Sequence, residues 1–121
     1  FLKVITSAIE NKLHKIKMEW KKDKSMTIVI CSKGYPGKYK KNKIIKNLNK
    51  IDLSQKDFLF HAGTEHRDGK IISNGGRVLN ITSTGNNFLK IRKRTVTIIK
   101  KLNWKDGFYR KDIGWKVINN Q

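Results

Sequence analysis

Apolar side chains recur at helical spacing near both ends of the chain. Over residues 1–15 they fall at steps of three and four, the pattern of one face of an amphipathic helix. These positions are Leu2, Ile5, Ile9, Leu13 and Ile16. The same spacing returns over residues 85–102, at Phe88, Ile91, Thr95, Ile98, Ile99 and Leu102. Thr84 or Asn86 is expected to cap the start of this second helix.

The middle of the chain carries short runs of β-branched and aromatic residues that are typical of strands. We expect strands at residues 26–32, 58–61, 70–73 and 77–82. Asp68-Gly69 is a hairpin signal and is expected to join the second and third of these strands. Residues 44–57 fit either a short strand or a linking turn. Strands in the middle and helices at the flanks indicate an α+β fold.

Aromatic residues gather near the end of the chain and are expected to pack on the sheet. The cluster consists of Trp104, Phe108, Tyr109, Ile113 and Trp115. Residues 110–112 alternate in charge and are expected to attach this tail to its own domain or to a neighbouring domain by ionic contacts. Cys31 follows three apolar residues and has no histidine nearby in the sequence, so we expect a buried, unreactive thiol.

Length and composition favour one compact cytoplasmic domain. The chain has 121 residues, of which 37% are hydrophobic, enough to bury one small core. A polar segment at residues 16–24 separates the first helix from the rest. No apolar stretch approaches the roughly 20 residues that cross a bilayer, so no membrane partner is expected. The chain begins with Phe1 rather than Met, and we expect it to be a piece of a longer protein.

The chain is strongly basic, with a formal net charge of +19 from 28 Lys and Arg against 9 Asp and Glu. Such a charge is typical of proteins that bind nucleic acid or another polyanion. However, arginine, which binds phosphate and guanine through bidentate hydrogen bonds, occurs at only five positions. Lysine is spread over the whole chain together with abundant Ile and Asn, as an A+T-rich coding sequence would produce. We therefore expect no nucleic-acid partner, and a polyanion-binding module remains the alternative.

Four motifs follow one another in a characteristic order. They are Gly34-Tyr35-Pro36-Gly37, Phe60-His61-Ala62-Gly63-Thr64, Asn74-Gly75-Gly76-Arg77-Val78-Leu79 and Phe108-Tyr109-Arg110-Lys111-Asp112-Ile113-Gly114-Trp115. In this order and spacing the chain resembles the C-terminal domain of the phosphoribosylamine–glycine ligases, members of the ATP-grasp group. The resemblance covers about residues 26–118. It implies a small, mostly antiparallel sheet with flanking helices.

The resemblance also implies a division of the chain and a place in a larger enzyme. Residues 1–25 would be the linker helix and connection that leave an ATP-grasp domain, and residues 26–121 the C-terminal ligase domain. The family uses ATP to join glycine to phosphoribosylamine, which gives glycinamide ribonucleotide in purine biosynthesis. Glycine first forms an acyl phosphate, and the amine then displaces the phosphate.

In the family, ATP and Mg²⁺ are held by the ATP-grasp domain. This chain has neither a glycine-rich phosphate loop of the P-loop kind nor a cluster of carboxylates in its sequence. We therefore expect no cofactor here, no catalytic residue, and no activity without the N-terminal and ATP-grasp domains. A truncated or split-gene relic without a catalytic role is a further alternative.

The candidate substrate-binding residues lie in three of the motifs. Asn74, Gly75 and Gly76 form a tight turn with exposed backbone donors, and Arg77 follows it with a guanidinium that can hold a phosphate. Tyr35 and Pro36 form a rigid turn, although Lys33 stands where the family usually carries another glycine. His61 ends a strand, a place more typical of a hydrogen-bonded structural histidine. His14 and His66 have no partners at ligand spacing, so no metal site is expected.

Overall fold

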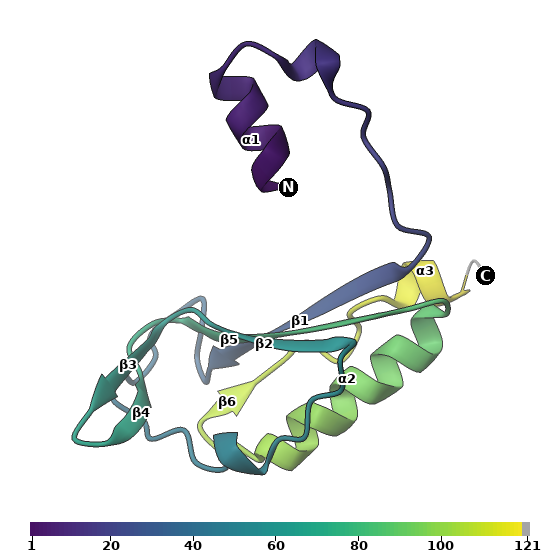
Figure 1. Cartoon of the computed structure of the whole chain (residues 1–121). Coiled ribbons are helices and arrows are strands. Elements are labelled where there is room, and N and C mark those ends of the chain that lie inside the picture. The colour runs from purple at the N-terminus through teal and green to yellow at the C-terminus, as the bar shows by residue number, and fades with distance from the viewer. Residues whose placement is uncertain (120–121) are drawn as a thin grey trace.

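The computed structural model describes residues 1–119 and has a four-stranded antiparallel sheet with one long helix against it (Figure 1). The strand order is β2-β5-β1-β6, and β3 and β4 form a separate hairpin. The strands are β1 Lys24–Ser32, β2 Asp57–His61, β3 Thr64–Arg67, β4 Lys70–Ser73, β5 Arg77–Gly85 and β6 Gly107–Phe108. The helices are α1 Leu2–Ile9, α2 Phe88–Leu102 and α3 Trp115–Asn119, with 3₁₀ turns at Leu13–Lys15 and Leu48–Lys50. The α+β class and the small antiparallel sheet are confirmed.

The core lies between α2 and one face of the two central strands, β1 and β5. Along β1, alternate residues are buried, as a strand with one covered face requires. Ile28 and Ile30 point to this face and pack with residues of β5 and α2, and Met26 is buried on the same face next to Gly114. Within residues 1–119, no helix covers the opposite face of the sheet (Figure 1). Side chains on that face are therefore available for binding.

The start of α2 is capped by Asn87, not by Thr84 or Asn86 as expected. The Asn87 side chain accepts a hydrogen bond of 2.9 Å from the backbone N–H of Lys90. Thr84 still belongs to β5, where its carbonyl accepts from Arg94, so it is too far back to cap the helix. The prediction was wrong because several neighbouring residues have side chains that could accept such a bond.

Replacing Asn87 with alanine is expected to lower the free energy of unfolding by about 1 kcal/mol, the usual value of a helix cap. Asn86→Ala is the matched control, because Asn86 is exposed and does not occupy the cap position. Urea denaturation followed by circular dichroism measures both. Equal losses in the two variants would contradict the assignment of the cap.

The hairpin turn at Asp68-Gly69 is confirmed, but its first strand is β3, not the strand expected at 58–61. Residues of β3 are polar and show no apolar alternation, so no pattern in the sequence marks this strand. β2 instead pairs with β5 along the edge of the main sheet. Residues 44–57 contain no regular strand before β2: Ile44 forms one isolated bridge to Ile72, and a 3₁₀ turn follows.

The N-terminal helix is shorter than predicted and stands apart from the sheet (Figure 1). It ends at Ile9, and Asn11 takes a left-handed conformation two residues later. No residue of α1 is buried, and the apolar side chains of Leu2, Ile5 and Ile9 are all exposed. No helix of residues 1–119 is long and apolar enough to cross a membrane.

The C-terminal tail packs as predicted except at Phe108, which is not among the residues packed against the core, and at its end. Trp104, Tyr109 and Ile113 lie against the core, but Trp115 is 52% exposed on the short helix α3. The tail is held by Arg92, whose guanidinium donates to the carbonyls of Ile113 and Lys111. The side chains of the charged trio at 110–112 contribute little to this, since Arg110 and Asp112 pair with each other on the surface.

Candidate anion-binding site

A pocket of about 460 Å³ opens on the sheet face opposite α2. Val29 of β1 and Asn80 of β5, which face each other in the strand register, form its floor. Tyr35, Ala62, Gly63, Gly76 and Arg77 complete the wall.

A β-bulge directs Arg77 into this pocket. The register between β1 and β5 shifts after Ile30, which faces Leu79, so that Cys31 faces Arg77 and Val78 is the extra residue. Regular alternation from Ile81 would have turned Arg77 toward α2. The bulge instead buries both Val78 and Leu79 and turns Arg77 to the open face.

The turn before Arg77 is held by Ser32, a residue at the end of β1 that is only 2% exposed. The Ser32 hydroxyl donates to the carbonyl of Gly75 at 2.9 Å, and its backbone N–H donates to the carbonyl of Gly76 at 2.8 Å. Both carbonyls therefore point toward β1. These two hydrogen bonds fix the orientation of the peptide groups next to the pocket.

Two of the glycines are required by close packing. A Cβ on Gly63 would lie 2.7 Å from both the carbonyl oxygen of Arg77 and the Cα of Gly75. A Cβ on Gly76 would lie 2.1 Å from the ring of Tyr35. The loop at Gly63, the turn at Gly75 and the Tyr35 ring thus fit together only because these positions lack side chains.

Three donor groups beside the pocket, two backbone amides and one guanidinium, have no hydrogen-bond partner among residues 1–119. The backbone N–H groups of Gly75 and Gly76 donate to no group of residues 1–119. Gly75 is partly exposed, whereas Gly76 is buried beside the Tyr35 ring, so the expectation of exposed donors holds for Gly75 alone. The exposed guanidinium of Arg77 has no hydrogen bond or ion pair within the same residues. Adjacent free N–H groups beside a guanidinium are the donor set that holds phosphate or carboxylate.

Arg77 differs in this respect from the other four arginines. Arg67, Arg94 and Arg110 each pair with a carboxylate, and Arg92 donates to backbone carbonyls. Within the described part of the chain, Arg77 alone keeps its full binding capacity for a ligand.

The residues singled out from the sequence fall into two groups. Tyr35, Gly76 and Arg77 line the pocket, and Gly75 adjoins it. The others do not line it. Asn74 donates to the carboxylate of Glu65 at 3.1 Å, Pro36 is exposed in its turn, and His61 pairs with the hydroxyl of Thr64 at 3.0 Å.

Four pocket residues were missed from the sequence, namely Val29, Ala62, Gly63 and Asn80. Alternation along the strands was the available signal for Val29 and Asn80, because each is flanked by residues of the covered face. Cys31 is half-buried on this open face, not fully buried as expected. Burial raises the pKa of its thiol and the charge of Arg77 lowers it by less, so the thiol stays protonated at neutral pH.

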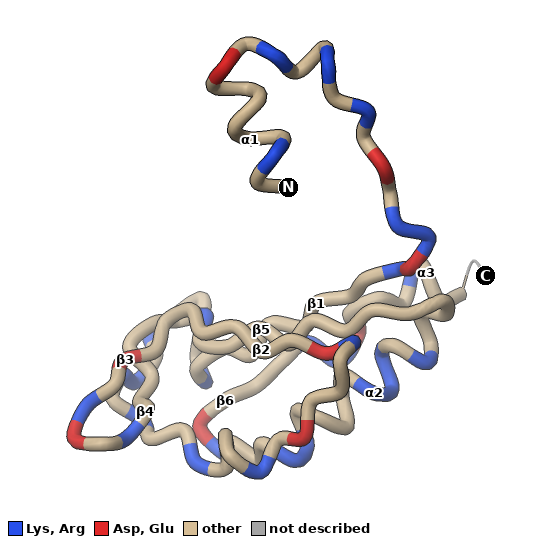
Figure 2. The backbone as a smooth tube through the Cα atoms, viewed as in Figure 1, with Lys and Arg blue, Asp and Glu red and all other residues tan. Residues whose placement is uncertain are grey.

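No group of three His, Cys, Asp or Glu side chains among residues 1–119 is placed to hold a metal ion. Lys and Arg residues occur in the N-terminal connection, the β3–β4 hairpin and α2 alike (Figure 2).

Comparison with known proteins decides the family. The model of the family described as "Phosphoribosylglycinamide synthetase, C domain" matches residues 25–116. The chain belongs to this family. The match includes β1 from its second residue, the other strands of the sheet, α2 and the pocket, so the resemblance carried by the four motifs is confirmed.

Relatives of this C domain are much longer proteins. The chain is 38% identical over 120 residues to the phosphoribosylamine–glycine ligase of Brucella melitensis, covering 99% of this chain and 28% of the relative. The ligase of Agrobacterium fabrum is 40% identical over 117 residues, covering 97% and 27%. The chloroplastic ligase of Arabidopsis thaliana is 37% identical over 121 residues, covering 98% and 23%. The chain therefore spans about a quarter of the curated relatives that it matches.

A solved structure agrees with the fold of this C domain. The crystal structure of the phosphoribosylamine–glycine ligase of Thermotoga maritima superposes with a TM-score of 0.66 at 28% identity. The match covers 89% of this chain and 27% of that one.

Proposed function

We propose that this domain forms one wall of the phosphoribosylamine site of a phosphoribosylamine–glycine ligase. The observation that carries the proposal is the unpaired guanidinium of Arg77 at the pocket, next to the free amides of Gly75 and Gly76. The substrate is a ribose phosphate that bears an amine. Its phosphate matches this donor set in charge and in hydrogen-bond type.

In this proposal the domain binds and orients one substrate. Arg77 and the two amides hold the phosphate, and Asn80 and Val29 lie beneath the ribose on the floor of the pocket. Holding the substrate in this way would place its amine for attack on the acyl phosphate of glycine.

ATP and Mg²⁺ would be held by other parts of the complete ligase. Among residues 1–119 no carboxylate cluster fits a magnesium ion, which prefers carboxylate oxygens as its protein ligands. This chain alone is expected to be inactive.

Residues 1–25 are proposed to be the linker between this domain and a preceding ATP-grasp domain. The exposed apolar face of α1 supports this, since Leu2 and Ile9 are 77% and 78% exposed. An amphipathic helix with an exposed apolar face is typical of a segment that packs against a partner surface. The preceding domain would supply that surface.

Direct binding tests the phosphate site in the chain as it exists. We expect ribose 5-phosphate to shift the backbone amide signals of Gly75 and Gly76 in a ¹⁵N NMR titration. Arg77→Ala should weaken binding about tenfold, which corresponds to the lower end of the contribution of a hydrogen bond between charged groups. Arg67→Ala is the matched control, because Arg67 is half-exposed outside the pocket and should change affinity less than about twofold. Equal weakening in both variants would mean that net charge alone attracts the phosphate.

A chimera tests the role in catalysis. This chain would replace the matching C-terminal part of the Agrobacterium fabrum ligase, to which it is 40% identical. Arg77→Ala in the chimera should raise the KM for phosphoribosylamine and leave the KM for ATP unchanged. An unchanged KM for phosphoribosylamine would reject the proposed role of Arg77.

A further inference from the structure

A second pocket of about 330 Å³ lies on the other side of the sheet, at the C-terminal end of α2. Its location follows from strand geometry: Ile30, on its floor, is the neighbour of Val29, which lines the first pocket, and consecutive residues of a strand point to opposite faces. A ligand in one pocket therefore does not contact the other.

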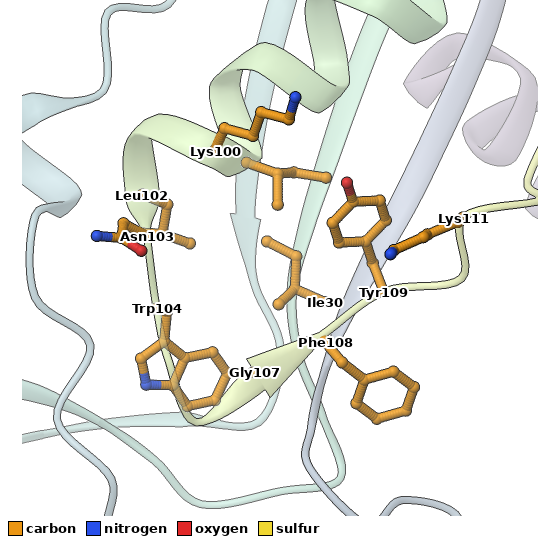
Figure 3. Close-up of a pocket in the computed structure, with 10 residues that line it drawn as sticks. Ile30, Lys100, Leu102, Asn103, Trp104, Gly107, Phe108, Tyr109 and Lys111 are labelled. Carbon is orange, nitrogen blue, oxygen red and sulfur yellow. The ribbon is translucent and has the colours of Figure 1, made fainter.

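The walls of this second pocket are apolar and aromatic. Figure 3 shows the rings of Trp104 and Tyr109 on either side of Ile30, while Phe108 points away. Ile99 and Leu102 of α2 close the space from the helix side. The Trp104 ring packs closely on the backbone of Gly107, where a Cβ would lie 2.3 Å from it. Such a volume and lining suit a small, flat apolar group.

The rim carries positive charge. Lys100 extends from α2 and Lys111 lies beside the Tyr109 ring (Figure 3). Neither amino group forms an ion pair with the described residues. Among residues 1–119, no acidic side chain lines the pocket. An apolar floor below two unpaired ammonium groups favours a molecule with an apolar ring and one anionic group.

We propose that the pocket between Trp104 and Tyr109 binds a small organic anion with an apolar ring, held by Lys100 and Lys111. The ring lies against Ile30 and Trp104. The anionic group reaches the rim, where the two amino groups donate to it. This site is independent of the proposed phosphate site, and its test does not rely on ligase activity.

The probe is 1-naphthaleneacetate, and 1-naphthaleneacetamide is its uncharged counterpart of the same shape. Both are titrated into the complete 121-residue chain. The indole N–H signals of the three tryptophans report binding in ¹⁵N NMR spectra, with Trp104 assigned through Trp104→Phe. Trp20 and Trp115 are 83% and 52% exposed and serve as internal controls.

We expect the acetate to shift the Trp104 signal with a dissociation constant on the order of a millimolar, as for a ligand of about fourteen heavy atoms. The acetamide should bind about fivefold more weakly, and the double variant K100M/K111M should weaken the acetate by about the same factor. The double variant K90M/K93M removes two exposed lysines elsewhere on α2 and should change affinity less than about twofold.

Three outcomes would overturn the proposal. Equal affinity for the acetate and the acetamide would show adsorption of the ring alone. Equal weakening by both double variants would show attraction by net charge. A response at Trp20 or Trp115 without one at Trp104 would place the binding outside this pocket.

Discussion

Gly63→Ala is expected to lower the free energy of unfolding by about 3 kcal/mol, at the upper end of the usual cost of overpacking. The added methyl group would lie 2.7 Å from two backbone atoms, the Arg77 oxygen and the Gly75 Cα. Backbone atoms do not move aside as the end of a flexible side chain would. The loop at Gly63 must therefore separate from the turn, which also breaks the hydrogen bond from Gly63 N–H to the Arg77 carbonyl.

Gly85→Ala is the matched control for this substitution. Gly85 is buried and Gly63 is half-buried, but a methyl group on Gly85 meets Ile91 at an ordinary 3.4 Å. Urea denaturation should show a loss below about 1 kcal/mol for the control. Binding of ribose 5-phosphate should be lost in Gly63→Ala even where the domain is still folded. Similar stability of the two variants would refute the close packing.

The second large effect is expected at the ion pair between Arg94 and Asp57. The Asp57 side chain is 2% exposed, and Arg94 Nε lies 2.8 Å from its Oδ1. Arg94→Met would leave this buried carboxylate without its positive partner. We expect a loss of about 2–4 kcal/mol at pH 7, below the maximum for buried pairs because Arg94 is 35% exposed. Arg110→Met, which removes a surface pair with Asp112, is the control.

The same pair predicts a pH dependence of stability. Burial raises the pKa of the Asp57 carboxyl, but hydrogen bonds from Ser54, Ser83 and Arg94 and the charge of Arg94 outweigh it, so the pKa is lowered. A lowered pKa means that the carboxylate stabilises the fold fully above about pH 3.9, the unfolded value, and less as the pH falls through the folded value.

Arg94→Met should therefore lose less stability relative to the unchanged chain at pH 3 than at pH 7. Protonation neutralises the carboxylate that the substitution leaves unpaired. Denaturation at both pH values measures the difference. A loss that is the same at pH 3 and pH 7 would show that Arg94 stabilises the fold by packing and not by charge.

The run of Ile and Val was enough to predict β1, alternation was enough for β5, and helical spacing was enough for α2, because all three elements pack against one core. The sequence pattern failed for β3, whose residues are polar and whose only partner strand within residues 1–119 is β4. The buried apolar side chain of this hairpin, Ile72, belongs to β4, whereas β3 has no apolar residue, so no pattern marks β3. The clustering of aromatic residues in the tail wrongly placed Trp115 in the core. The presence of such a cluster does not tell which of its members faces solvent.

The candidate site was predictable in part. The glycine turn and Arg77 were recognised from residue type and from the family resemblance. The bulge at Val78 was not, because a sequence with apolar residues at both 78 and 79 is also compatible with regular alternation. That bulge decides which face Arg77 occupies. Likewise, Asn74 is used in a hydrogen bond to Glu65, and His61 in one with Thr64. These pairings depend on the folded backbone and are not evident from the sequence.

The alternation along β1 has a consequence for how this domain can vary. The even-numbered residues from Met26 to Ile30 belong to the core, and Ser32 holds the turn before Arg77. Thr27, Val29 and Cys31 face the open side of the sheet. Substitutions at the odd positions can alter what the open face recognises while the core keeps its side chains. An insertion or deletion of one residue would exchange the two sets at once. Ligand preference in this strand can therefore diverge by point substitution, while its length is held constant by folding.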